Sequence, residues 1–197
     1  MINKITLEFA EIIGLLCAEG SHIISYSTYT ENRYNKQYVR NNKKSERIEF
    51  YNKDKNLSHH YLNLLFKEFG LRFRITKDGK VNIGNRAVIK RIITETPLGH
   101  LNWQVPESVA NSNLITKLYF LRGFFDGDGT AVGTVRFFST NYGGIHQISG
   151  LLKELNYKHT IQGPVSKPKR KPYYIIQISR KDQFRFLEDI QPISKYV

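Results

Sequence analysis

The chain has 197 residues, and 40% of them are hydrophobic. This is enough apolar sequence for one substantial core or two small, closely packed halves, so a disordered tail is excluded. Thirty Lys and Arg against 17 Asp and Glu leave a formal charge of +13, which favours a polyanionic partner such as nucleic acid or an anionic membrane surface.

The sequence has one cysteine, Cys17. It excludes an internal disulfide and a cysteine-rich zinc site, and such a chain suits a reducing compartment. No apolar run reaches the roughly 20 residues that a membrane span needs, and residues 1–11 lack the charged-then-apolar order of a signal peptide. We therefore expect an intracellular protein without a membrane partner, in a prokaryotic cytoplasm or in an organelle such as a mitochondrion or chloroplast.

Two segments of the chain repeat one pattern. In residues 7–20, apolar side chains recur at helical spacing and the segment stops at a glycine, and residues 115–129 have the same form. Both are predicted to be helices. Aligning Gly14 with Gly123 sets an offset of 123 − 14 = 109 residues and matches a glycine, two apolar residues, a small residue, an acid and a second glycine. An internal repeat is therefore the first hypothesis.

Strand-like sequence follows each of these helices. A further helix comes next in both copies, because residues 65–71 resemble residues 151–157 at an offset of 151 − 65 = 86. The second copy is thus 109 − 86 = 23 residues shorter between these points, and the polar stretch at 31–45 is the natural place for the extra length. The strands are expected at residues 21–30, 47–51, 72–76 and 80–85 in the first copy and at 131–140, 158–162 and 173–179 in the second.

Each copy closes with a helix, expected at residues 87–94 and 181–190. Two prolines and a glycine at 97–106 are typical of a linker, which separates an N-terminal repeat at 1–96 from a C-terminal repeat at 107–197. The sequence predicts an α+β fold, a mixed α/β architecture of two pseudo-symmetric αββαββα repeats. Because the strands alternate polar and apolar residues, each antiparallel sheet should carry helices on one face and leave the other free to meet a duplex groove.

A stripe of small residues lies on each of the two repeated helices. Gly14 and Ala18 are four residues apart, as are Gly123 and Gly127. Helices with such stripes can pack with their backbones unusually close. The sequence therefore predicts a central two-helix interface between the repeats.

Each stripe leads directly to an acid, Glu19 in the first copy and Asp128 in the second. Close packing would bring the two carboxylates together, where they repel each other unless cations intervene. Such a pair suits a hard divalent metal with oxygen ligands, and magnesium is expected. Two metals on a scissile phosphate can activate the attacking water and stabilise the leaving oxygen, and in so basic a chain the phosphate would arrive as nucleic acid. One helix ending in an acid and a glycine is common, but its recurrence in the same register favours a functional pair.

The two helical segments resemble the motif that names the LAGLIDADG homing endonuclease family, with IIGLLCAEG at 12–20 and LRGFFDGDG at 121–129. The resemblance covers nearly the whole chain, since the order of elements in each half is similar to the family's repeat. It implies a site-specific, intron-encoded type of DNA endonuclease that makes a metal-dependent double-strand break in a long, pseudo-palindromic target. It also implies a monomer whose saddle-shaped sheets lie in the major groove of double-stranded DNA.

The resemblance further implies which groups bind metal. Glu19, Asp128 and the backbone carbonyls of Ala18 and Gly127 would hold Mg²⁺, Mn²⁺ would substitute for it, and Ca²⁺ would support binding without cleavage. Cys17 stands where the motif's name has an aspartate. That position is not the usual ligand, so we expect Cys17 to be buried packing.

The family also tends to place a polar residue and a lysine after the second strand, near the cleavage centre. Asn52 and Lys53 fit that place in the first half, although Lys53 could equally be a solvated residue at a helix start. In the second half Ser139 and Thr140 stand there without a lysine. The two strands of the target would then be cut at unequal rates, or Arg122 or Arg136 would take the place of the lysine.

Many basic side chains in expected strands and loops are candidates for DNA contact, although any one of them is more often merely solvated than a base reader. The run at 167–171 is better explained as a loop on phosphates between two strands than as a nuclear-targeting signal. The candidates are Arg33, Lys36, Arg40, Lys43, Lys44, Arg47, Arg72, Arg74, Lys77 and Lys80 in the first half and Arg136, Lys158, Lys167, Lys169, Arg170 and Lys171 in the second.

Other functions remain open. An RNA maturase that assists group I intron splicing, with its own intron RNA as partner, or a non-cleaving DNA-binding regulator would keep the fold, and loss of either acid would favour them. Both acids are present here. An intein is disfavoured because the chain lacks flanking splicing blocks and a terminal His-Asn pair. A membrane-surface protein is disfavoured because it would need a basic amphipathic helix, whereas many basic residues here lie in expected strands and loops.

Overall fold

The computed structural model describes residues 5–169 and 171–193. Its first half consists of α1 (Leu7–Glu19), β1 (Gly20–Arg33), β2 (Lys36–Tyr51), α2 (Lys55–Phe69), β3 (Lys80–Ile83) and α3 (Arg86–Glu95). Its second half consists of α4 (Glu107–Ala110), α5 (Leu114–Asp128), β4 (Gly129–Thr130), β5 (Arg136–Ser139), α6 (Tyr142–Glu154), β6 (His159–Val165), β7 (Tyr173–Ile178) and α7 (Arg180–Ile190). The predicted α+β fold with two related halves is confirmed.

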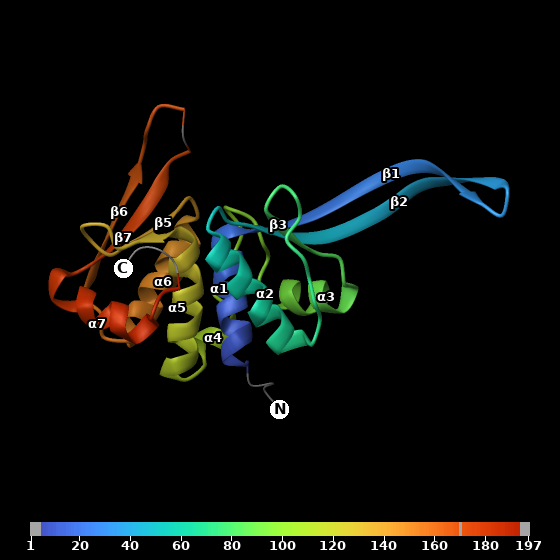
Figure 1. Cartoon of the computed structure of the whole chain (residues 1–197). Coiled ribbons are helices and arrows are strands. Elements are labelled where there is room, and N and C mark those ends of the chain that lie inside the picture. The colour runs from blue at the N-terminus through green and yellow to red at the C-terminus, as the bar shows by residue number, and fades with distance from the viewer. Residues whose placement is uncertain (1–4, 170, 194–197) are drawn as a thin grey trace.

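The helices α1 and α5 run side by side through the centre of the molecule (Figure 1). A Cβ added at Gly14 would lie 2.2 Å from the carbonyl oxygen of Phe120, and one added at Gly123 would lie 2.3 Å from that of Glu11. Each glycine therefore lets the backbone of the other helix come into direct contact, as the stripes of small residues predicted. This packing fixes the two halves against each other at the level of their main chains.

Equivalent caps begin the two central helices. The Thr6 side chain accepts a hydrogen bond from the backbone N–H of Phe9, and the Asn113 side chain accepts one from Thr116. Such bonds satisfy backbone donors that a helix leaves open at its start. Both helices end one residue before a glycine, Gly20 or Gly129, so the two acids occupy equivalent last positions.

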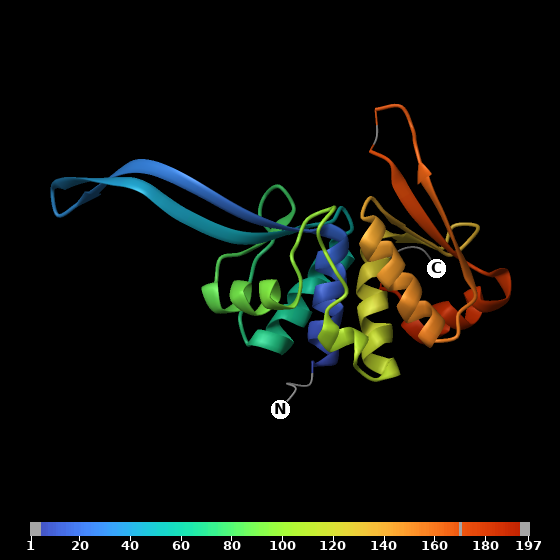
Figure 2. The same ribbon diagram turned by 180° about the vertical axis from the view of Figure 1, so that it is seen from behind.

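Two antiparallel sheets lie on one side of the helices (Figures 1 and 2). Their strand orders are β1-β2-β3 in the first half and β4-β5-β7-β6 in the second. In each sheet one face packs on the helices through alternate apolar residues, such as Ile48 and Phe50 on β2 and Ile176 and Ile178 on β7, all at most 1% exposed. The opposite face of each sheet is left free, as the alternation predicted.

One hydrophobic core runs through both halves. The segment that joins the halves contributes to it, because the Trp103 ring is 1% exposed and packs at a tilt against Phe124, with 4.8 Å between ring centroids. A Cβ on Gly144 would lie 2.3 Å from that ring. The packing of Trp103 therefore fixes the path of the connecting segment along the second half. This path determines which side chains of the segment can take part in a functional site. Among the described residues, no helix combines the length and apolar character that crossing a bilayer requires.

Two strand predictions were wrong. Residues 72–76 form no strand, because a tight turn closed by Gly79 N–H and the Thr76 carbonyl (3.0 Å) reverses the chain so soon that only Ile75 pairs, with Val81. Of residues 131–140 only β5, at Arg136–Ser139, is strand, because a turn in which Gly133 has φ +73 separates it from the two-residue β4. A left-handed backbone of this kind favours glycine and ends a strand.

The extra length of the first half lies where it was expected, but as strand. Residues 31–45 extend β1 and β2 into a two-stranded ribbon that projects far beyond the rest of the molecule (Figure 1). Its outer part is exposed on both faces. Polar sequence is compatible with strand here because neither face has to join the core.

Candidate active site and nucleic-acid interface

Glu19 and Asp128 end α1 and α5 next to each other. A Cβ added at Gly127 would lie 2.4 Å from the Ala18 Cβ and 3.2 Å from the Glu19 Cγ. The small residues at 18 and 127 thus let the last turns of the two helices touch, which puts both carboxylates at one point. The charge of Glu19 is close enough to act on Asp128.

Burial raises the pKa of both carboxyls into the neutral range. It raises the pKa of Glu19 to about 7, an increase that a hydrogen bond from Asn52 opposes. Burial also raises the pKa of Asp128 to about 8, and the negative charge of Glu19 adds to that increase. Both shifts have the sign expected for anions that lack a nearby cation. A divalent ion between the two would therefore stabilise their ionised forms.

Asn52 is fixed against Glu19 in the first half. Its Nδ2 donates to Glu19 Oε1 at 2.9 Å, and its Oδ1 accepts from the backbone N–H of Asp54 at 2.8 Å. Asp54 in turn caps α2 by accepting from Asn56. Lys53, the next residue along, is exposed and lines a hollow of about 620 Å³ that the turn at 76–79 closes. The structure thus brings Asn52 to Glu19, whereas Lys53 lines a hollow that this acid does not border.

Ser139 and Thr140 take the same place in the second half. Ser139 Oγ accepts from the backbone N–H of Asn141 at 3.0 Å, and Asn141 caps α6 by accepting from Gly144. The local geometry of Asn52 and Asp54 is therefore repeated, but with a hydroxyl in place of the amide. Two hydroxyl side chains stand where the first half has an amide and an ammonium.

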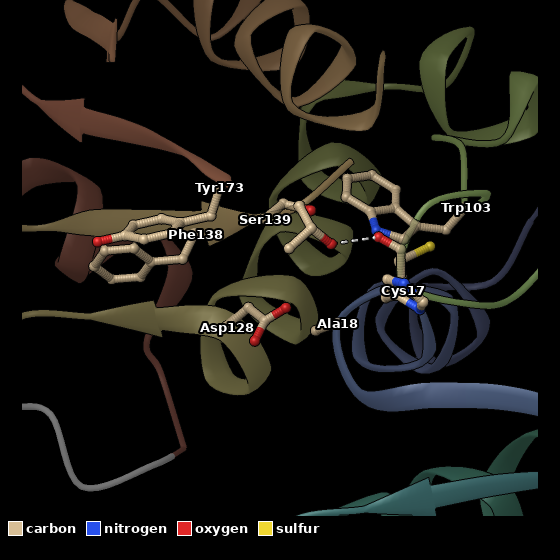
Figure 3. Close-up of a pocket in the computed structure, with 9 residues that line it drawn as sticks. Cys17, Ala18, Trp103, Asp128, Phe138, Ser139 and Tyr173 are labelled. Atoms are coloured by element: carbon tan, nitrogen blue, oxygen red, sulfur yellow. Dashed lines mark hydrogen bonds between the residues drawn. The ribbon is translucent and has the colours of Figure 1, made fainter. Parts of the chain in front are cut away.

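A hollow of about 310 Å³ borders Asp128 on this side. Figure 3 shows Asp128 near Ala18 of α1, with Phe138 and Ser139 of β5 on the other side. His100, which the sequence gave no reason to single out, also lines this hollow. It comes from the connecting segment, whose path over the second half no sequence pattern reveals.

Arg122 does not fill the place of the missing lysine. Its guanidinium makes two hydrogen bonds to the carboxylate of Glu11, from Nε to Oε1 at 2.9 Å and from Nη2 to Oε2. Glu11 is 0% exposed and also bonds His60 Nε2 at 2.6 Å. Arg136 donates to Gln177 Oε1 at 3.1 Å and lies on the free face of its sheet with Phe138, which lines the hollow.

The fold is that of known endonucleases. Over 93% of this chain and 94% of the other, it superposes with mesophilic variants of the homing endonuclease I-DmoI at a TM-score of 0.67 and 18% identity. I-DmoI in complex with DNA and Mn matches at 0.67 and 18% over 97% and 98%. The meganuclease I-SmaMI bound to uncleavable DNA matches at 0.56 and 14% over 94% and 85%. The chain has the LAGLIDADG fold.

Sequence comparison agrees for the second half. Residues 116–191 match the model of the LAGLIDADG-like domain, and no curated protein sequence matches the chain. Within this LAGLIDADG fold, Cys17 is 3% exposed and burial raises the pKa of its thiol, so it is packing as expected. Asp126, at the matching position of the second motif, instead accepts hydrogen bonds from the backbone N–H of Ile193 at 3.0 and 3.1 Å.

The free face of the first LAGLIDADG sheet continues onto the ribbon. Since Ile48 and Phe50 face the helices and side chains alternate along a strand, Arg47 and Lys43 lie on the opposite, outer face. Lys44 lies on the helix side, where its Nζ is 3.1 Å from the Glu46 carboxylate. Neighbouring lysines therefore point to opposite faces of the ribbon.

A β-bulge changes the alternation further out. Ser27 pairs with Lys43 but Tyr29 pairs with Arg40, so β2 carries one more residue than β1 in this interval. Paired residues share a face, and Lys43 Nζ donates to the Tyr29 hydroxyl at 2.9 Å, which puts Arg40 on the same face as Lys43. By this register the outer face holds five of the six predicted ribbon cations, namely Arg33, Lys36, Arg40, Lys43 and Arg47.

The other predicted DNA contacts lie outside the ribbon, and of these Lys77 lines the hollow beside Lys53. Arg72, Arg74 and Lys77 are exposed near the base of the first sheet, and Lys80 binds Glu49 at 3.2 Å. In the second half Lys158, Lys167, Lys169 and Lys171 are exposed. Lys167 lies 5.9 Å from the Tyr173 ring centroid, and Lys171 contacts His100. Arg170 lies outside the described residues.

Proposed function

We propose that this protein is a site-specific homing endonuclease that cuts both strands of double-stranded DNA with divalent metal. The observation that carries the proposal is the pair of carboxylates, Glu19 and Asp128, which glycine-mediated helix packing holds together beneath two sheets with free faces. The outer-face cations of the ribbon and the charge of +13 supply attraction to the phosphate backbone.

The donor groups fit magnesium. Within residues 5–169 and 171–193, no three or more His, Cys, Asp or Glu side chains gather into a metal site, so two carboxylates have to suffice. Magnesium commonly takes one or two carboxylates together with waters and substrate phosphates. The last carbonyls of a helix lack partners inside it, which suits Ala18 and Gly127 as further ligands. Complexes of I-DmoI contain DNA with Mn or with Ca, so we propose that Mn²⁺ replaces Mg²⁺ here and that Ca²⁺ supports binding alone.

The proposal gives each residue around the two acids a defined role. When bound, the metal supplies a Lewis acid for the attacking water and the leaving oxygen. Glu19 and Asp128 supply the negative charge that holds it, and Asn52 orients Glu19 through its amide N–H. We propose that Lys53, which follows Asn52 and is exposed at the first hollow, supplies an ammonium to the scissile phosphate of one strand. The asymmetry between Asn52–Lys53 and Ser139–Thr140 predicts unequal cutting of the two strands.

The two halves of the DNA target should differ in length. The 14 residues of β1 span about 46 Å at about 3.3 Å per residue, close to 14 base pairs of B-DNA. The seven residues of β6 span about 23 Å on the same basis. We propose a single chain that acts as a monomer on a long, pseudo-palindromic site whose half under the ribbon is the longer, inside a prokaryotic cytoplasm or an organelle.

The first experiment incubates the purified protein with DNA spanning the intron-free allele of its host gene, with Mg²⁺ or with Ca²⁺. Wild type should cut both strands in Mg²⁺ and bind without cutting in Ca²⁺. Glu19→Gln and Asp128→Asn should each abolish cleavage and keep binding, whereas Glu107→Gln, an exposed acid on α4, should change nothing. Tight binding by wild type without cleavage would refute the nuclease. It would favour a regulator, or a maturase if intron RNA is bound as well.

A further inference from the structure

The connecting segment delivers a histidine to the Asp128 hollow. His100 lines this hollow together with Asp128, Ser139 and Thr140. Its backbone carbonyl accepts a hydrogen bond from Thr140 Oγ1 at 2.8 Å, and the buried Trp103 anchors the segment three residues further on. The position of His100 is therefore set by two contacts to the second half that do not involve its ring.

Lys171 orients the ring itself. Lys171 Nζ and His100 Nε2 are 2.6 Å apart. An ammonium group can only donate, so Nε2 accepts and the ring proton of the neutral imidazole resides on Nδ1. Among the described residues no group accepts from Nδ1, so this N–H remains available as a donor. The connection thus supplies a hydrogen-bond donor at the hollow, and the loop between β6 and β7 supplies the cation that holds it.

The two halves differ at this point. The first half has Asn52 against Glu19 and Lys53 at its hollow, whereas Ser139 and Thr140 occupy the matching positions in the second. Hydroxyls carry no charge to offset that of a phosphate. Lys171 brings a positive charge to this side of the second half, and His100 comes from the connection, which lies outside the repeated unit.

We propose that His100 is a catalytic residue for the scissile phosphate beside Asp128, and that Lys171 is its positioning residue. This inference rests on the proposed function. In the reaction, water oxygen bonds to phosphorus as the P–O3′ bond breaks, the 3′ oxygen gains a proton from solvent water, and the attacking water loses one to solvent. His100 Nδ1–H donates to a non-bridging phosphoryl oxygen throughout and gives up no proton. A preorganised donor of this kind stabilises the charge of the transition state.

Strand-specific cleavage tests the proposal. A duplex labelled at both 5′ ends with different dyes reports each strand separately in Mg²⁺. His100→Ala and Lys171→Met should slow the same strand about 100-fold and leave the other strand unchanged, so nicked DNA accumulates. Lys53→Met should slow the opposite strand. His100→Asn, which keeps a donor near Nδ1, and Lys171→Arg should restore most of the rate. The exposed α6 residues His146 and Lys153 provide the matched controls His146→Ala and Lys153→Met.

A binding measurement separates contact with phosphate from effects on rate. In Ca²⁺, duplexes with a single nick and a 5′-phosphate at one of the two cut positions are compared. His100→Ala should weaken binding of only one of them, by about tenfold, because a hydrogen bond to a charged group is lost. If wild type cuts neither strand, the proposed function is wrong. If wild type cuts both, and His100→Ala slows them equally or not at all, the assignment of His100 is wrong.

Discussion

Replacing Lys43 with glutamine should weaken DNA binding, whereas the same change at Lys44 should not. The two residues are adjacent, but Lys43 lies on the outer face with Tyr29 and Lys44 lies on the helix side with Glu46. Each phosphate neutralised adds about 0.9 to the slope of log affinity against log salt. Lys43→Gln should therefore reduce the slope by about 0.9, and the triple change with Lys36→Gln and Arg40→Gln should reduce it by about 2.7.

The corresponding loss of affinity can be worked out. If variant and wild type bind equally at 1 M salt, a slope change of about 0.9 is about an eightfold loss at 0.1 M. Fluorescence anisotropy of a labelled target duplex in Ca²⁺, from about 0.05 to 0.4 M salt, measures slope and affinity together. A fall in slope for Lys44→Gln as large as for Lys43→Gln would refute the assignment of faces. Thermal unfolding should be unchanged in both, because neither lysine belongs to the core.

Three further results are expected. Gly14→Ala and Gly123→Ala should lower the free energy of unfolding by about 1–3 kcal/mol, because the new methyl meets backbone at 2.2 and 2.3 Å. Gly150→Ala on α6, where the methyl would have nothing within 4 Å, should be neutral or stabilising. Equal free energies of unfolding for the three variants in urea would contradict the close packing of α1 and α5. In EDTA, the folded-state pKa values of about 7 for Glu19 and about 8 for Asp128 exceed the ordinary 4.5 and 3.8, so these two groups make the metal-free protein lose stability as pH rises from about 5 to 8. Asp128→Asn should reduce that loss of stability, and the affinity of the wild type for Ca²⁺ should rise over the same pH range. An affinity for Ca²⁺ that did not change with pH would count against both pKa shifts. Arg122→Met should cost about 3–5 kcal/mol by leaving Glu11 buried without its cation, whereas Arg122→Met combined with Glu11→Leu should recover much of the loss in the same urea assay.

Patterns formed by residues close together in the sequence were sufficient to predict the central packing of α1 against α5. The spacing of Gly14 and Gly123 predicted the helix contact, because helical geometry fixes which residues share a face and glycine fixes how near a neighbour can come. The helix contact follows from local periodicity applied twice. The family resemblance, and not the periodicity, implied a place for Asn52 near the cleavage centre, and the structure gives Asn52 a hydrogen bond to Glu19.

Features that depend on the path of the chain in space could not be obtained in this way. The faces of the ribbon do not follow from counting, because the bulge puts Arg40 and Lys43, three residues apart, on one side. Residues 72–76 have strand-like sequence but no neighbouring strand beyond a single pair. His100 lines the Asp128 hollow because Trp103 packs into the second half and fixes the path of the connection.

The Glu11–Arg122 pair gives the two halves a preference for each other. The repeat offset of 109 places Phe120 opposite Glu11 in the alignment and Ile13 opposite Arg122 (11 + 109 = 120; 122 − 109 = 13). Two copies of the first half, packed in the same way, would bury Glu11 with His60 but no arginine to bind it, and two copies of the second half would leave Arg122 without its two hydrogen bonds to Glu11. A buried charge without a partner is strongly unfavourable, so self-pairing is opposed and the unlike pairing is selected. Whatever symmetric ancestor such a duplicated chain had, this pair favours the unlike pairing of its halves over a return to homodimers.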